Sequence, residues 1–89
     1  MLFEWDETKR DRNLRVHGVD FIDMAQIFDG RPTFTYRSPR NDEERWGTVG
    51  IVSDRFYLVV WTVRGERRRI ISAYRADEWE IREYRALYG

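Results

Sequence analysis

The chain has 89 residues and a mass of 10.9 kDa, which is enough for one hydrophobic core, and we therefore expect a single domain over residues 1–89. Its 42% hydrophobic and 16% aromatic content favours a globular fold over disorder, and the absence of cysteine excludes disulfides, thiolate metal sites and a cysteine nucleophile. The 16 basic and 16 acidic residues cancel, and the pI near 6.6 lies below the range typical of nucleic-acid-binding domains.

The charges are unevenly distributed along this neutral chain. Residues 1–44 contain seven basic and ten acidic residues, whereas residues 45–76 contain seven basic and two acidic ones. Fifteen of the 16 cations are arginines, which suit bidentate binding of phosphate or carboxylate, although a GC-rich genome gives the same bias. The second half of the chain can therefore form a basic face.

The first third of the chain predicts a short strand and two helices. Residues 2–5, Leu-Phe-Glu-Trp, form a short, mostly apolar start that is compatible with an edge strand. A helix is expected from Glu7 to His17, because Asp6 is a suitable N-cap and Gly18 a suitable left-handed C-terminal cap. A second helix is expected from Phe21 to Phe28, with apolar residues at positions i, i+3, i+4 and i+7 that define one buried face.

The remainder predicts a β-meander followed by a helix. Residues 37–44 are expected to form an exposed loop, and short links between the later strands indicate antiparallel hairpins. The expected strands are 33–36, 45–52, 56–63 and 67–74. Residues 56–63 lack polar alternation, which favours a strand covered on both faces, by the first two helices on one side and by the last helix or a partner chain on the other. The last helix begins at Asp77, which has capping-box spacing to Glu80.

The order and spacing of short segments along most of the chain resemble the BrnT family, the toxins of bacterial BrnT/BrnA type II toxin–antitoxin pairs. The residues that carry the resemblance are Phe3-Glu4-Trp5-Asp6, Lys9, Asn13, His17-Gly18-Val19, Phe21, Ala25, Phe28-Asp29, Glu44-Arg45, Ile51, Val59-Val60, Thr62, Arg69-Ile70-Ile71-Ser72-Ala73, Arg75-Ala76, Glu80 and Tyr84. One departure is that Tyr74 precedes Arg75 where the family usually has two basic residues.

The resemblance implies a fold, an activity and partners. The implied fold is a RelE-like α+β fold, with two N-terminal helices packed on a four-stranded antiparallel sheet and a C-terminal helix. The implied activity is metal-independent RNA cleavage by a toxin that inhibits translation. The implied partners are an RNA substrate, a BrnA-like ribbon-helix-helix antitoxin that neutralises the toxin, and operator DNA bound through the antitoxin in a toxin–antitoxin heterotetramer.

Metal-free RNA cleavage needs a base for the 2′-hydroxyl, cations for the phosphate and an acid for the leaving oxygen. With His17 as the single histidine, a two-histidine pair within one chain is impossible. The last hairpin brings together Arg64, Glu66 and Arg69, so the arginines are candidates for binding phosphate and Glu66 is a candidate base.

Lys9 and His17 are further catalytic candidates. With Asn13 they are spaced at i, i+4 and i+8 and share one polar stripe of the first helix. Such a stripe is also typical of a helix side that faces solvent or a partner, so both interpretations remain open.

Arg45, Arg67 and Arg75 are candidates for RNA binding. Strand alternation predicts that Arg67 and Arg69 share a face while Arg68 points to the other. A charged hairpin end that discourages edge aggregation is the alternative explanation of this run. Trp46, beside Arg45, is more typical of a core or interface.

Several site classes find no support in the sequence. One histidine and no cysteine leave only carboxylates for a metal site, and there is no glycine-rich phosphate loop, so we expect no metal and no cofactor. The longest apolar run is far too short to cross a membrane and the start lacks a signal-peptide stretch, so we expect a cytoplasmic protein without membrane contact. A non-catalytic module whose basic half binds an acidic protein or nucleic acid is the alternative function.

Overall fold

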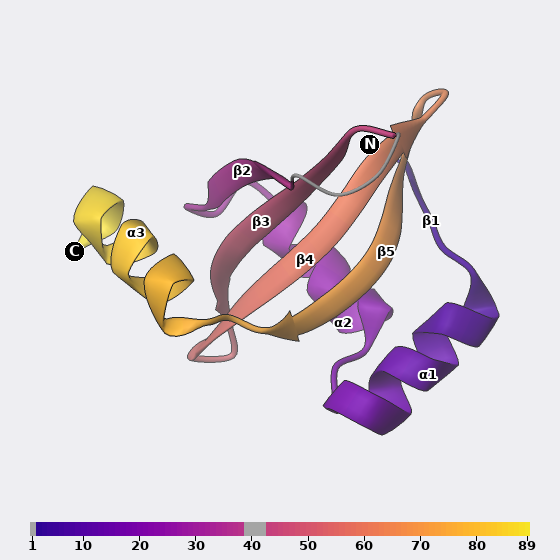
Figure 1. The fold of residues 1–89 in the computed structure, drawn as a ribbon, viewed down its shortest axis with the longest axis horizontal. Helices are drawn as coiled ribbons and strands as arrows, with labels where there is room; N and C mark the ends of the chain where they lie inside the picture. The colour runs from indigo at the N-terminus through magenta and orange to yellow at the C-terminus, as the bar shows by residue number, and fades with distance from the viewer. Residues whose placement is uncertain (1, 39–42) are drawn as a thin grey trace.

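A five-stranded mixed sheet forms the centre of the molecule in the computed structural model, which describes residues 2–38 and 43–89. The strands lie in the order β1-β5-β4-β3-β2. The elements in chain order are β1 (Leu2–Glu4), α1 (Glu7–His17), α2 (Phe21–Met24), the 3₁₀ helix η1 (Ala25–Phe28), β2 (Phe34–Ser38), β3 (Arg45–Val52), β4 (Arg55–Arg64), β5 (Arg67–Arg75) and α3 (Glu78–Tyr88). Figure 1 shows α1 and α2 along one side of the sheet and α3 well away from them.

The sheet differs from the expected four antiparallel strands. β2 to β5 form the predicted antiparallel meander, with ends within about two residues of those expected from the pattern. The apolar N-terminal segment adds a fifth strand, because β1 pairs in parallel with β5. Its register sets Glu4 opposite Arg69, and the two side chains form an ion pair at 2.6 Å between Oε2 and Nη1. A three-residue strand carries no pattern that reveals its partner or direction, so this pairing was not predictable.

The caps of α1 are those expected from the sequence. The Asp6 carboxylate accepts hydrogen bonds from the backbone N–H groups of Thr8 and Lys9, and these bonds lower its pKa. Gly18 ends the helix with a φ of 70°, in the left-handed region. Both ends of α1 are therefore determined locally.

A side-chain amide anchors the polar helix α1 to the sheet. Asn13, 6% exposed, donates from Nδ2 to the carbonyl oxygens of Val19 and Ala73, and its Oδ1 accepts from the N–H of Ala73. Since β1 pairs with β5 only at residues 67–69, the Asn13 amide takes the place of a strand neighbour further along that edge. Asn13 is thus a structural residue within the stripe that also holds Lys9 and His17.

The expected second helix changes type half-way. It is α-helical over Phe21–Met24 and 3₁₀-helical over Ala25–Phe28, so the deeply buried residues Phe21, Met24 and Ile27 follow a spacing of three. Ile27 packs over Gly50 of β3, where an added Cβ would lie 2.7 Å from the Ile27 Cγ1. The predicted α-helical face correctly included Phe21 and Met24 but missed Ile27.

Only one face of the sheet is fully covered. The face under α1, α2 and η1 holds the main core, which consists of Val19, Phe21, Met24, Ile27, Val52, Val59, Ile70 and Ala73. On the opposite face α3 covers one end, where the Tyr84 ring packs edge-on against Phe56 at 5.3 Å. Within the chain α3 does not cover Leu58 and Val60 of β4, which line an open groove, so cover of this part of β4 by a partner chain stays a prediction.

Candidate functional site

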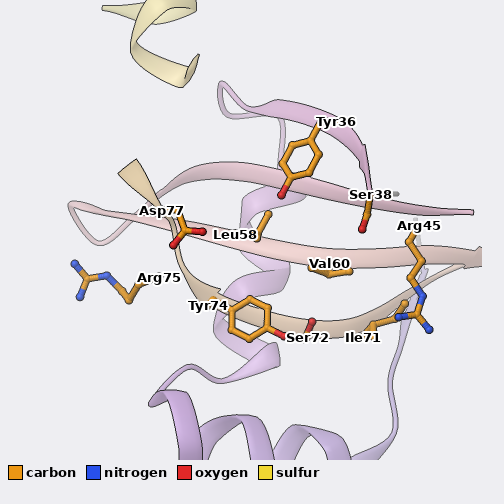
Figure 2. Close-up of a pocket in the computed structure, with 10 residues that line it drawn as sticks. All are labelled: Tyr36, Ser38, Arg45, Leu58, Val60, Ile71, Ser72, Tyr74, Arg75 and Asp77. Carbon is orange, nitrogen blue, oxygen red and sulfur yellow. The ribbon is translucent and has the colours of Figure 1, made fainter. Parts of the chain in front are cut away.

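A groove lies on the sheet face that α3 leaves uncovered, and we call it the open-face groove (Figure 2). Its volume is about 580 Å³, within the usual range for a site that binds a small molecule or a nucleotide. Strands β2 to β5 and the start of α3 contribute its lining. The lining residues are Tyr36, Ser38, Arg45, Leu58, Val60, Ile71, Ser72, Tyr74, Arg75 and Asp77.

The centre of the open-face groove is apolar and its ends differ in charge. Leu58 and Val60 of β4 form the floor, between Tyr36 of β2 and Tyr74 of β5 (Figure 2). Arg45 lies at one end and Asp77 at the other. The groove therefore offers a flat ring an aromatic side chain at either wall, and an anion can bind at its Arg45 end.

A glycine and a buried carboxylate hold Tyr36 in the groove wall. An added Cβ at Gly47 would lie 2.7 Å from Cζ of Tyr36, so the absent side chain lets the ring lie against the sheet. The Tyr36 hydroxyl donates to Oε2 of Glu80 at 2.6 Å, and Glu80 is 1% exposed. Its Oε1 accepts from the backbone N–H of Asp77 at 2.8 Å. Glu80 thus joins the start of α3 to the wall of the groove.

Burial and the hydrogen bond to Glu80 raise the pKa of Tyr36 far above its ordinary value. The hydroxyl therefore stays protonated at neutral pH, and Tyr36 is a donor rather than a general base.

Removing this hydroxyl tests its structural contribution. Tyr36→Phe leaves Oε2 of the buried Glu80 without its donor, and we expect a loss of about 1–3 kcal/mol in the free energy of unfolding, measured by urea denaturation at pH 7. The pKa of Tyr36 is raised only in the folded state, so the protonated hydroxyl stabilises the folded protein at pH values below the ordinary pKa of 10.0. This contribution to the free energy of unfolding is lost as the pH rises above that value. Wild type should thus lose stability above pH 10 more steeply than Tyr36→Phe. Tyr74→Phe, on the opposite wall, is the control, and equal stability of Tyr36→Phe and wild type would contradict the assignment.

The sheet register continues the open-face groove into a group of arginines. On β3 and β4, Trp46 pairs with Trp61, so the preceding residue Arg45 lies opposite Thr62. Thr62 in turn pairs with Arg69 on β5. Arg64 and Arg67 form the next pair on the same face. We call Arg45, Arg64, Arg67 and Arg69 the arginine patch. Two strand spacings separate Arg45 from Arg69, about 10 Å.

Acidic side chains pair with the arginine patch. Arg69 pairs with Glu4 at 2.6 Å, and their side chains are 23% and 26% exposed. Arg45 pairs with Glu43 at 3.1 Å, and the same carboxylate lies 3.9 Å from Arg64. These partners hold the guanidinium groups in place, and a bound phosphate would compete with them for the same donors.

A smaller hollow of about 210 Å³ adjoins the groove beside α1. Its lining includes Lys9, Arg12 and His17 of α1 and shares Ile71, Ser72 and Tyr74 with the groove, and we call it the helix-side hollow. The His17 ring packs edge-on against Tyr74 at 4.6 Å. Lys9 and His17 therefore lie next to the groove across a shared wall.

Comparison with known families decides the relationship. Residues 5–80 match the model of the family described as the ribonuclease toxin BrnT of type II toxin–antitoxin systems. The chain belongs to the BrnT family. Every lining residue of the open-face groove lies within the matched range. No curated protein matches the chain significantly.

The predicted site residues of this BrnT chain fall into two regions. Arg64, Arg67 and Arg69 lie in the arginine patch with Arg45, and Glu66 lies in the adjoining turn of the β4–β5 hairpin. Lys9 and His17 line the helix-side hollow. Arg75 is at the rim of the groove, but its guanidinium points away from it (Figure 2) and lies 5.8 Å from the ring centroid of Tyr57.

Arg68 and Trp46 lie on the opposite, helix-covered face. The Arg68 guanidinium carbon lies 3.9 Å from the ring centroid of Phe28 and 4.3 Å from that of Trp61, and burial lowers its pKa. Trp46 stacks on Trp61 at 5.0 Å. The predicted alternation of the arginine run and the core-like placement of Trp46 are thus consistent with the register.

Sequence reasoning missed most of the open-face groove. The residues that were not candidates are Tyr36, Ser38, Ser72, Tyr74 and Asp77, because no motif or spacing distinguishes them from ordinary strand and cap residues. The one available signal was the replacement of a basic residue by Tyr74, which marks a position where the chain departs from the family pattern.

The part of the chain that the structure describes lacks two classes of feature. Residues 2–38 and 43–89 contain no group of three or more histidine or acidic side chains arranged to hold a metal ion. None of the described helices is long and apolar enough to cross a membrane.

Proposed function

We propose that this BrnT family member is a metal-independent endoribonuclease toxin that cleaves RNA by attack of the ribose 2′-hydroxyl and so inhibits translation. The observation that carries the proposal is the continuity of the open-face groove with the arginine patch on one sheet face. Aromatic walls can stack an unpaired base while the neighbouring guanidinium groups bind its phosphates, which is how proteins recognise single-stranded RNA.

The reaction transfers two protons around one phosphate. A base removes the proton of the 2′-hydroxyl, the oxygen attacks phosphorus to form a 2′,3′-cyclic phosphate, and the leaving 5′-oxygen takes a proton from an acid. Arg64 and Arg69 are proposed to bind the phosphate oxygens, whose charge grows in the transition state. Glu66 is the proposed base at the hairpin, and Lys9 or His17 supply the alternative proton transfer from the helix-side hollow.

Cleavage in excess EDTA tests the proposed reaction. The purified chain, incubated with end-labelled RNA, should yield fragments that carry 2′,3′-cyclic phosphate or 3′-phosphate ends. Glu66→Gln should reduce the cleavage rate about 100-fold or more while RNA binding persists, because a general base contributes that much. Glu83→Gln, an exposed change of the same charge on α3, is the matched control.

Each result has a separate meaning. Unchanged cleavage by Glu66→Gln would remove Glu66 as the base and leave Lys9 and His17. Binding without cleavage, both in EDTA and with translating ribosomes, would favour a non-catalytic binding module.

The proposed partners follow from the type II toxin–antitoxin family. We infer a BrnA-like ribbon-helix-helix antitoxin that neutralises the toxin by covering the arginine patch and the groove together, in a heterotetramer that binds operator DNA through the antitoxin. The exposed cations of the patch support this, because an acidic antitoxin surface would complement them. A complex that leaves Arg64 and Arg69 open to RNA would contradict inhibition by occlusion.

A further inference from the structure

A carboxylate within a groove proposed to bind RNA requires an explanation. Asp77 lines the end of the open-face groove opposite Arg45 (Figure 2). Among the ion pairs of the described residues, none includes Asp77. Among these described residues, the Asp77 carboxylate is therefore a groove acceptor outside any ion pair, and as the N-cap of α3 it also accepts from the backbone N–H of Glu80.

The two ends of the groove orient a nucleotide. A carboxylate repels phosphate, whereas Arg45 and the rest of the arginine patch attract it. A bound nucleotide therefore directs its phosphate toward Arg45 and its base toward Asp77. An ionised carboxylate can only accept hydrogen bonds, so the base that suits this end is one that presents donors.

Guanine fits these groups better than the other bases. Its Watson–Crick edge presents two adjacent donors, the N1–H and the N2 amino group. The Asp77 carboxylate can accept both, because its two oxygens offer about four lone pairs and the cap of α3 uses one of them, for the backbone N–H of Glu80. Adenine and cytosine offer one amino group on that edge and uracil one imino group. Tyr36 and Tyr74 provide faces on which the base can stack, and Leu58 provides an apolar floor.

We infer that Asp77 selects guanine in the open-face groove, which makes it the specificity-determining residue of this toxin. The inference rests on the proposed function in that it takes RNA as the occupant of the groove. It adds to that function the preferred base, the orientation in which the nucleotide binds and the residue that recognises the base.

Binding of uncleavable RNA tests the inference separately from catalysis. The probes are 2′-O-methyl pentanucleotides UUXUU, with X as guanine, adenine, cytosine, uracil or hypoxanthine, and their dissociation constants are measured by fluorescence anisotropy. The guanine probe should bind about 10- to 100-fold more tightly than the adenine probe. Hypoxanthine keeps N1–H but lacks the 2-amino group, and it should lose about tenfold against guanine.

Asp77→Asn is the decisive variant. Asparagine also caps helices well, so α3 keeps its start, but one acceptor oxygen becomes a donor. The guanine preference should fall to less than about threefold in Asp77→Asn. The asparagine NH2 group would face an N–H donor of guanine, so one hydrogen bond between guanine and residue 77 is lost. The matched control is Glu78→Gln, an exposed change of the same charge one residue further along, and it should keep the preference.

Two results would overturn the inference. One is equal binding of all five probes by wild type, and the other is an unchanged guanine preference in Asp77→Asn. Cleavage of unmodified RNA in EDTA would persist in either case if the proposed function is right. Conversely, a guanine preference that depends on Asp77 in a protein that does not cut RNA would support the inference and contradict the proposed reaction.

Discussion

Arg69→Ala is expected to lower the rate of RNA cleavage about 100- to 1,000-fold, as removal of one group that stabilises transition-state charge does in other enzymes. Arg69 lies in the row that links Arg45 to β1, and its guanidinium is partly buried against Glu4 at 2.6 Å. A preoriented, partly desolvated guanidinium loses little entropy when it binds phosphate. The measurement is the single-turnover cleavage rate in excess EDTA.

Three comparisons separate this role from a structural one. If the ion pair with Glu4 mattered only for holding β1, then Glu4→Gln would lose as much activity as Arg69→Ala. We expect instead that Glu4→Gln keeps or raises the rate, because it frees the guanidinium for phosphate. Arg69→Lys should be intermediate, since an ammonium keeps the charge without the bidentate fork. Arg82→Ala, on the exposed side of α3, is the control for loss of one charge.

Asn13→Ala is expected to reduce the free energy of unfolding by about 2–4 kcal/mol. The substitution leaves the N–H and C=O of Ala73 and the C=O of Val19 without a partner in a buried region. A chain of 89 residues has a total stability of only about 5–13 kcal/mol, so the loss is a large part of it.

Urea denaturation measures this effect. Arg12→Ala, an exposed neighbour on α1, is the matched control and should change stability by less than about 0.5 kcal/mol. Asn13→Asp should be as destabilising as Asn13→Ala, because a carboxylate can accept from Ala73 but cannot donate to the two carbonyl oxygens. A stability equal to that of Arg12→Ala would show that the three hydrogen bonds contribute little.

The sequence predicts this fold best where local signals act alone. Asp6 and Gly18 define the ends of α1 through backbone groups within a few residues, and Asp77 and Glu80 form the capping box expected from their spacing. The three long antiparallel strands follow from β-propensity and short links. Such features need no knowledge of distant residues, which is why they could be derived.

Features that depend on distant partners were not predictable. The parallel pairing of β1 with β5 and the hydrogen bonds between Asn13 and Ala73 join residues 60 or more positions apart. No sequence pattern in one segment identifies the other as its partner. Glu80 illustrates the same limit: its spacing predicts the bond to Asp77, but the second oxygen binds Tyr36 from β2. The groove combines residues from four strands and a helix cap, so it exists only in the folded sheet.

The placement of Arg68 between Phe28 and Trp61 has a consequence for the ionic-strength dependence of binding. Each phosphate that a protein neutralises releases condensed counterions, so the slope of affinity against salt counts the cations that reach the nucleic acid. Three consecutive arginines suggest three such contacts, but strand alternation and aromatic stacking place Arg68 on the helix-covered face, away from the face proposed to bind RNA. If RNA binds as proposed, we therefore expect the salt dependence of binding to include Arg67 and Arg69 of this run and not Arg68.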